Sequence, residues 1–142
     1  MIVVDANVLV YAHNTDSPAH DRANAWLERA LSGSESIGFA WSTIGAFIRI
    51  VTNHRAFEHP LTIAQATEIV DSWLASTVAI ILQPGSEHWK IFRNLLESGQ
   101  ANGNLVPDAH LAALAIEHGA TLLSIDRDFH RFQDLAFTPF TN

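Results

Sequence analysis

A chain of 142 residues with 48% hydrophobic and 16% charged residues can bury a core of its own, and it is too apolar for a disordered segment. It has no cysteine, which excludes disulfides and thiolate metal sites. Its 15 acidic and 8 basic residues give a net charge of −7, which counts against nucleic-acid binding unless bound cations reverse the field at a carboxylate cluster or a basic partner covers the surface.

The first half of the chain alternates short apolar runs with helical periodicity. The β-branched run Ile2–Val4 predicts a buried strand that ends at Asp5, and a second strand is expected over Ile37–Trp41. One helix is predicted after Ser17–Pro18, and another from a Ser42–Thr43 cap to about residue 53. Apolar residues at helical spacing form their inward faces: Ala23, Trp26, Leu27 and Ala30 in the first, and Ile44, Phe47, Ile48 and Val51 in the second.

The second half continues the alternation. Thr62 is a plausible cap for a helix, and Val78–Leu82 is expected to be a strand stopped by Pro84 and Gly85. The remaining predicted elements are a helix from Ser86 to Gly99, a helix over Pro107–His118, a strand over Leu122–Ile125 and a possible last strand over Leu135–Phe137. Apolar residues at helical spacing form the inward faces of two of these helices: Ala66, Ile69, Val70, Trp73 and Leu74 in the helix capped by Thr62, and Trp89, Ile91, Phe92, Leu95 and Leu96 in the helix from Ser86.

This alternation of strands and helices predicts an α/β sandwich with a mainly parallel central sheet and helices on both faces. The length predicts a single domain over residues 1–142. No apolar run approaches the roughly 20 residues that span a bilayer, and no leader-like segment stands at the start, so we expect no membrane association and a cytoplasmic location.

Three carboxylates are expected at one edge of this sheet. Asp5 and Asp126 each follow a predicted strand, and Asp108 lies in the first turn of a predicted helix. Because chemistry in parallel sheets gathers beyond the carboxyl ends of the strands, these side chains could form a pocket for hard cations such as Mg²⁺ or Mn²⁺. Such ions activate water and stabilise the leaving oxygen in phosphodiester hydrolysis. Asn7 and Ser124 are close in sequence and could orient waters or ligands.

Each residue also has a purely structural interpretation. Asp5 could cap a short helix, Asp108 could complement a helix dipole, and Asp126 could belong to a turn. Asn7 and Ser124 could serve in ordinary capping and turn hydrogen bonds. The joint placement of the three acids favours the functional interpretation.

Three sequence blocks, Val3–Val8, Asn104–Ala115 and His118–Phe129, make the chain resemble the PIN-domain family, and specifically toxins of the VapC type. The resemblance covers essentially the whole chain. It implies a PIN-like three-layer sandwich, Mg²⁺- or Mn²⁺-dependent endoribonuclease activity, homodimerisation, and inhibition by a VapB-type antitoxin encoded alongside. By position, Asp5, Asp108 and Asp126 match the metal-binding acids of the family, and Asp128 is a plausible further ligand.

One departure from the family pattern concerns a glutamate that many relatives carry on the helix corresponding to residues 42–53. Residues 44–49 contain no acid here. Fewer carboxylates could then suffice, or Asp128, Asp16 or Asp21 could compensate. The departure also keeps open a second hypothesis, a catalytically weak or inactive PIN-like module that binds or regulates.

The basic residues, histidines and tryptophans give further expectations. Histidines lack the i, i+4 spacing of a zinc protease, and the four tryptophans are expected to fill the core and a dimer interface.

A dehalogenase-like phosphatase or a receiver domain is disfavoured because Asn7 replaces the second aspartate and Lys90 is the only lysine. Four arginines, two on or just after the helix to residue 53 and two after Asp126, are candidates for contacts with RNA phosphates or an antitoxin: Arg49, Arg55, Arg127 and Arg131.

Overall fold

The fold is an α/β sandwich around a five-stranded sheet, seen in a computed structural model that describes residues 1–141. The strands run in the order β3-β2-β1-β4-β5 and every pairing is parallel, so the sheet is more uniform than the mainly parallel one predicted. The strands are β1 (Ile2–Val4), β2 (Ile37–Ala40), β3 (Ala79–Leu82), β4 (Thr121–Ser124) and β5 (Ala136–Pro139). All five predicted strands are present, each within about two residues of its expected bounds.

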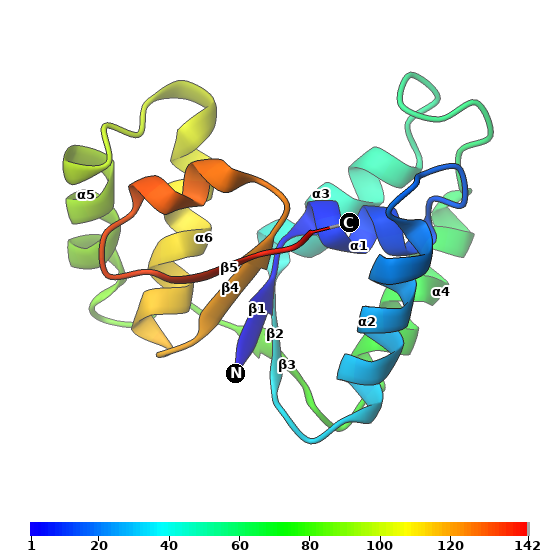
Figure 1. Ribbon diagram of the computed structural model, residues 1–142, viewed down its shortest axis with the longest axis horizontal. Coiled ribbons are helices and arrows are strands. Elements are labelled where there is room, and N and C mark those ends of the chain that lie inside the picture. The colour runs from blue at the N-terminus through cyan, green and yellow to red at the C-terminus, as the bar shows by residue number, and fades with distance from the viewer. Residues whose placement is uncertain (142) are drawn as a thin grey trace.

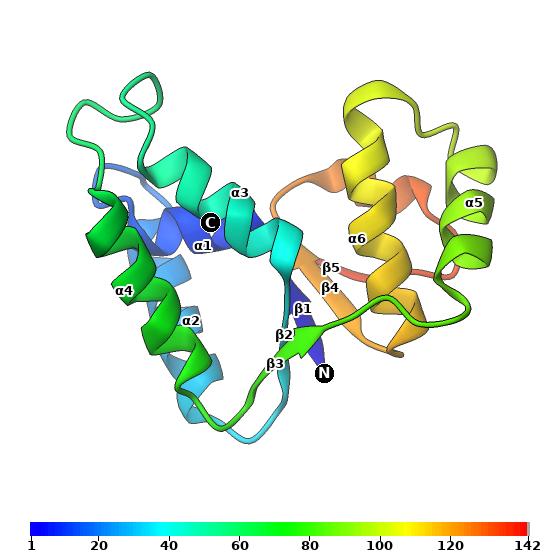
Figure 2. The same cartoon turned by 180° about the vertical axis from the view of Figure 1, so that it is seen from behind.

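Six α-helices cover the two faces of the sheet. They are α1 (Ala6–His13), α2 (His20–Ser32), α3 (Trp41–Val51), α4 (Ile63–Leu74), α5 (His88–Ser98) and α6 (Val106–Glu117). Two short 3₁₀ helices, η1 (Gly103–Leu105) and η2 (Arg127–Arg131), were not predicted. Helices α1 to α4 lie on one side of the sheet, and α5 and α6 lie on the other (Figure 1, Figure 2).

Alternate residues of the central strands supply two separate cores. Val4 and Leu123 belong to the core beneath α1 to α4, whereas Val3 and Leu122 belong to the core beneath α5 and α6. A parallel strand that is covered on both faces is apolar at every position, which explains the uninterrupted β-branched run at β1. The largest fully buried side chain is Trp73, which stacks on Phe39 with ring centroids 5.7 Å apart.

Helix ends differ from the predictions where the sheet, rather than a cap residue, fixes them. Helix α3 begins at Trp41 directly after β2, and its N-cap is Ala40 without a side-chain cap bond, so the expected Ser42–Thr43 cap is wrong. Thr43 is buried instead, at 3% exposure. The Thr62 cap is confirmed: its hydroxyl accepts from the amide of Gln65, and the Gln65 side chain accepts from the Thr62 amide.

The tryptophans divide between core and surface. Trp73 is buried and Trp26 packs partly buried against the same core, as predicted. Trp41 and Trp89 are 56% and 63% exposed, so the prediction that Trp89 lies on the inward face of its helix is wrong. Leu95 supplies the buried contact of that helix. Across residues 1–141, no helix combines the length and the apolar character needed to cross a membrane.

Candidate active site

Asp5 and Asp126 lie at the carboxyl ends of the two neighbouring strands β1 and β4. The two strands pair in register with Val4 opposite Leu123, and the Asp5 amide donates to the carbonyl of Leu123 at 3.0 Å. Asp5 is the N-cap of α1, where its Oδ1 accepts from the Ala6 amide at 2.7 Å. Asp126 is the N-cap of η2, where its Oδ1 accepts from the Asp128 amide at 2.8 Å. The capping interpretation of Asp5 is therefore confirmed, and Asp126, for which only a turn was expected, caps η2. In each case the carboxylate remains at the sheet edge.

The buried hydroxyl of Ser124 joins these two aspartates. Ser124 is fully buried, and its Oγ donates to Asp5 Oδ2 at 2.7 Å. The same oxygen accepts from Asn7 Nδ2 and from the Asp126 amide, both at 3.0 Å. One donated and two accepted bonds use the full capacity of a hydroxyl group. Asn7 Oδ1 in turn accepts from the Ile125 amide at 3.3 Å, so Ser124 and Asn7 fix the β4–η2 turn against the start of α1.

Asp108 approaches this pair from the first turn of α6. Burial and, after it, the negative charges of Asp5, Asp126 and Asp128 together raise the pKa of its carboxyl to about 6, against the opposing charge of Arg131. Burial also raises the pKa of Asp5, against the hydrogen bonds from Ser124 and Ala6. In both residues burial is the largest cause and the neighbouring carboxylates add to it, and carboxyls with raised pKa values are frequent at functional sites.

The oxygen atoms of this cluster are of the kind that binds a hard divalent cation, but they lie too far apart to bind one ion together. Carboxylate oxygens, here those of four aspartates, are ligands that Mg²⁺ and Mn²⁺ take, and a cation would offset the mutual repulsion of the carboxylates. Within residues 1–141, however, no three His, Asp or Glu side chains stand close enough together to hold one ion as they are. Binding would therefore require the carboxylates to draw together.

Helix α3, which follows β2, contains no acidic residue, so a further carboxylate ligand would come from another element. The charges that act on Asp108 come from Asp5, Asp126 and Asp128. Asp128 is exposed and follows Asp126 in η2, so it remains the nearest candidate for a further ligand. Asp16 lines a different cavity, at the far end of α1.

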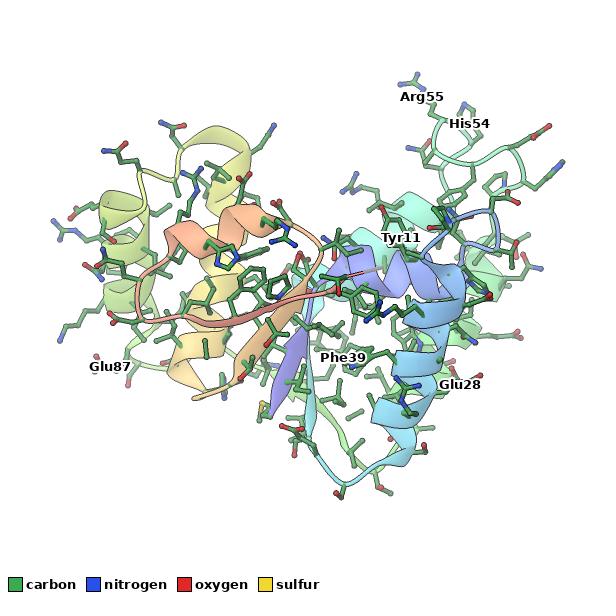
Figure 3. All side chains as sticks on the ribbon, viewed as in Figure 1. Tyr11, Glu28, Phe39, His54, Arg55 and Glu87 are labelled. Carbon is green, nitrogen blue, oxygen red and sulfur yellow. The ribbon has the colours of Figure 1, made fainter. Side chains whose placement is uncertain are left out.

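The four candidate arginines are not equally placed. Arg127 and Arg131 belong to η2 beside the carboxylates, and Arg131 donates to the carbonyl of Gly99 at 2.9 Å. Arg49 is exposed in the last turn of α3. Arg55 lies at the tip of the α3–α4 loop, away from the carboxyl edge of the sheet (Figure 3). The arrangement therefore favours Arg127 and Arg131 for contact with a substrate at the carboxylates, and disfavours Arg55.

Trp41 is a further side chain at this edge that the sequence pattern did not distinguish. It follows Ala40, the last residue of β2, and β2 pairs with β1. Its indole is 56% exposed, whereas the pattern predicted the apolar end of a strand. Trp41 is exposed because it is the first residue of α3 and not the last residue of β2, and the end of the strand fixes where that helix begins.

A comparison with protein families matches the PIN domain over residues 2–135. Among known proteins, the chain is 47% identical over 135 residues to VapC ribonuclease Mb2897 of Mycobacterium bovis, covering 95% of this chain and 92% of that protein. It is 45% identical over 133 residues to ribonuclease VapC37 of Mycobacterium tuberculosis, covering 94% and 92%.

Two solved structures share the fold. VapBC2 from Rickettsia felis, solved bound to a DNA fragment from its promoter, has a chain that superposes with a TM-score of 0.71 at 22% identity, covering 98% of both chains. VapC20 of Mycobacterium tuberculosis, a toxin that cleaves the sarcin-ricin loop, superposes with a TM-score of 0.64 at 17% identity, covering 96% of this chain and 99% of that one. At these identities the likeness is one of fold.

Proposed function

The chain belongs to the PIN-domain family, and from that premise we propose that it is a VapC-type toxin, an endoribonuclease that hydrolyses RNA with divalent metal ions at Asp5, Asp108 and Asp126. The ribonuclease activity is supported by relatives that are 45–47% identical and match over more than nine-tenths of their length. The observation that carries the choice of site is the cluster at the carboxyl ends of β1 and β4, where Ser124 links Asp5 to the Asp126 backbone.

In this proposal the three aspartates hold the metal, with Asp128 as a further ligand. Mg²⁺ or Mn²⁺, when bound, supplies an activated water and offsets charge on the phosphate. Asp5 is held in place by donors on both of its oxygens, from Ala6 and Ser124. Asn7 and Ser124 keep the β4–η2 turn in position, and Arg127 and Arg131 bind neighbouring RNA phosphates.

We include three further elements in the proposal. The partner is a VapB-type antitoxin, because the Rickettsia felis neighbour belongs to a VapBC assembly. The toxin forms a homodimer, as its resemblance to the VapC type implies, and the exposed indole of Trp89 on α5 is a candidate contact. Its site of action is the cytoplasm, where its RNA substrates are found.

The test is cleavage of total RNA by the purified, antitoxin-free chain in Mg²⁺, in EDTA, and with the Asp5→Asn variant. Discrete fragments that disappear with EDTA and with the substitution are the expected result. Asp71→Asn, which removes an exposed carboxylate on α4, is the matched control and should cleave normally. Intact RNA from a folded, metal-supplied chain would favour the alternative, a PIN-like binding module without activity.

The attacking group is tested with a substrate that carries a 2′-deoxy residue at the cut site. Attack by an activated water does not use the RNA 2′-hydroxyl, so cleavage should persist. Loss of cleavage with retained binding would contradict this mechanism and indicate attack by the RNA itself.

A further inference from the structure

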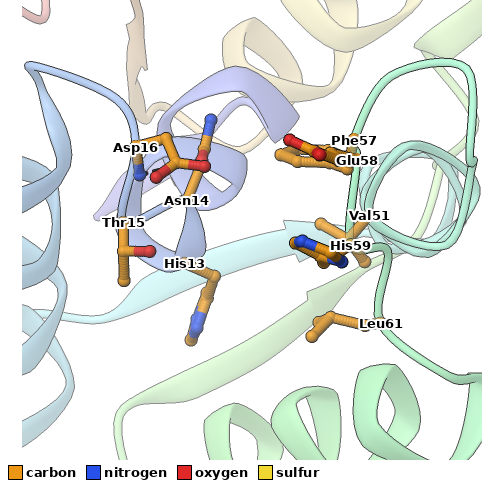
Figure 4. A pocket seen from close by; sticks show the side chains of 9 residues that line it. All are labelled: His13, Asn14, Thr15, Asp16, Val51, Phe57, Glu58, His59 and Leu61. Carbon is orange, nitrogen blue, oxygen red and sulfur yellow. Dashed lines mark hydrogen bonds between the residues drawn. The ribbon is translucent and has the colours of Figure 1, made fainter.

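A cavity lies at the opposite end of α1 from the carboxylate cluster. It has a volume of about 420 Å³ and opens between the α1–α2 turn and the segment that joins α3 to α4 (Figure 4). Helix α1 runs from its N-cap Asp5 to His13, which lines the cavity. At 1.5 Å per residue this places the cavity roughly 12 Å from the carboxylate cluster, so it is a separate site.

Carboxylates stand on both of its walls. Asp16 lies on the α1–α2 side and Glu58 on the α3–α4 side, facing each other across the opening (Figure 4). Both residues are exposed, and neither forms an ion pair within residues 1–141. The Asp16 amide donates to Asn14 Oδ1 at 3.2 Å, which fixes the turn on that side. Two unpaired carboxylates on facing walls concentrate negative potential in the space between them.

The inner part of the cavity is lined by apolar side chains. Phe57, Val51 and Leu61 line it, and the Leu61 amide donates to the Val51 carbonyl at 2.8 Å, which closes the α3–α4 segment. The His13 ring packs against Phe47, with centroids 5.6 Å apart. Its Nε2 is buried and has no hydrogen-bond partner in the part of the chain that the structure describes. The apolar part of the cavity can therefore take an aliphatic stem, while its polar contacts come from the outer walls.

We propose that this cavity binds the guanidinium group of an arginine side chain on a basic segment of the partner protein. A guanidinium has five donors on several edges, so it can reach carboxylates on two facing walls, and its methylene stem can lie along Phe57 and Leu61. A phosphate group would be repelled by the same carboxylates. That the partner is the antitoxin rests on the proposed function, whereas binding of the guanidinium does not.

The experiment is a backbone-amide NMR titration of the full-length chain with N-acetyl-arginine methylamide at pH 8, where histidine side chains carry little charge. The comparison ligand is N-acetyl-citrulline methylamide, which has nearly the same shape and no charge. The arginine compound should shift the amides of Asp16, Phe57 and Glu58 and saturate in the millimolar range expected for so small a ligand. The citrulline compound should bind about ten-fold more weakly because charge-assisted bonds are lost.

Single substitutions locate the site. Asp16→Asn and Glu58→Gln should each weaken binding of the arginine compound several-fold, while Glu68→Gln, an exposed glutamate on α4, is the matched control and should leave binding unchanged. Equal binding of arginine and citrulline, or shifts confined to the region of Asp5 and Asp108, would overturn the proposal. The proposal would also be overturned if a ribonucleotide such as guanosine monophosphate shifted the amide signals of the cavity residues and the arginine compound did not.

The readout is independent of RNA cleavage. A chain that binds arginine in this cavity and does not cut RNA would contradict the proposed function and leave this inference intact. A chain that cuts RNA and does not bind the arginine compound would support the proposed function and contradict this inference.

Discussion

The Ser124 hydroxyl donates a 2.7 Å hydrogen bond to Asp5 Oδ2 and thereby joins the ends of two neighbouring strands that are 119 residues apart in sequence. The bond leaves Asp5 with both carboxylate oxygens engaged, one by Ser124 and one by the Ala6 amide. A carboxylate held from two sides keeps its orientation in the absence of a ligand. The position of Asp5 is therefore a property of the β1–β4 pair.

Removing this hydroxyl should affect both stability and activity. Ser124→Ala leaves Asp5 Oδ2 without its donor, and it leaves Asn7 Nδ2 and the Asp126 amide without their acceptor. We expect a loss of about 2 kcal/mol in the free energy of unfolding, measured with urea. RNA cleavage should fall by about 10- to 100-fold through a weaker apparent affinity for Mn²⁺, as for other residues that orient metal ligands.

The Mn²⁺ dependence separates a positioning role for Ser124 from a purely structural one. Raising the Mn²⁺ concentration should restore part of the activity of Ser124→Ala. Ser72→Ala, which removes a hydroxyl bound only to the carbonyl of its own helix, is the control. If activity drops with no change in Mn²⁺ dependence, the positioning role is wrong.

Metal binding should stabilise the folded chain. Under the proposed function, a divalent ion held by Asp5, Asp108 and Asp126 binds the folded state alone, so Mn²⁺ at 100 times its dissociation constant should add about 2.7 kcal/mol to the free energy of unfolding. The measurement is thermal unfolding with Mn²⁺ and with EDTA. Asp108→Asn should abolish the shift, and Asp71→Asn should retain it. An equal Mn²⁺ shift in Asp108→Asn would place the metal elsewhere.

Glu117 is expected to fix the start of α5 onto the end of α6. Its two carboxylate oxygens accept from the amides of Gly85 and Glu87 at 2.8 and 3.1 Å. Glu117→Ala removes both bonds and should cost about 1–3 kcal/mol in urea unfolding. A Cβ at Gly85 would lie 2.6 Å from Glu117 Oε2, so Gly85→Ala should displace the same carboxylate.

A double-mutant cycle checks this coupling. If both substitutions act by breaking the same contact, the double variant Gly85→Ala with Glu117→Ala should be less destabilised than the sum of the two single variants. Additive losses would show that Gly85→Ala acts on something other than Glu117.

The sequence predicted the architecture well because the sheet is covered on both faces. Its strands, such as β1, are short apolar runs, and turn residues such as Gly99 and Gly119 follow the helices that they end. Gly119 has the positive φ of +62° that such a helix end requires. The Ser42–Thr43 cap is absent because β2 passes directly into α3, so the end of the strand, and not a cap residue, fixes where the helix begins.

The site was predictable only in part. The placement of Asp5 and Asp126 at strand ends follows from parallel pairing, and Asn7 and Ser124 were expected nearby. The bond between Ser124 and Asp5 depends on the register of β1 against β4, which a single sequence does not specify. The cavity at Asp16 and Glu58 had no signal in the sequence, because it forms where two turns from different helix pairs meet.

His13 should make the fold sensitive to acid. Burial lowers the pKa of its imidazole from 6.5, and the neighbouring His20 lowers it further. Below about pH 6.5 the unfolded chain therefore binds a proton at this position that the folded chain does not yet bind. The free energy of unfolding should fall as the pH drops from 7 towards 5 and should be insensitive to His13 above pH 7.

Replacing His13 should flatten that dependence. His13→Gln and His13→Phe remove the titrating group, so between pH 7 and 5 the slope of the unfolding free energy should decrease by up to about 1.4 kcal/mol per pH unit, the value for one proton. The slope that remains would include His110, whose pKa burial also lowers. His54→Gln, which removes an exposed imidazole on the α3–α4 loop (Figure 3), is the control. An unchanged slope in both His13 variants would show that the ring takes up its proton as readily in the folded chain as in the unfolded one.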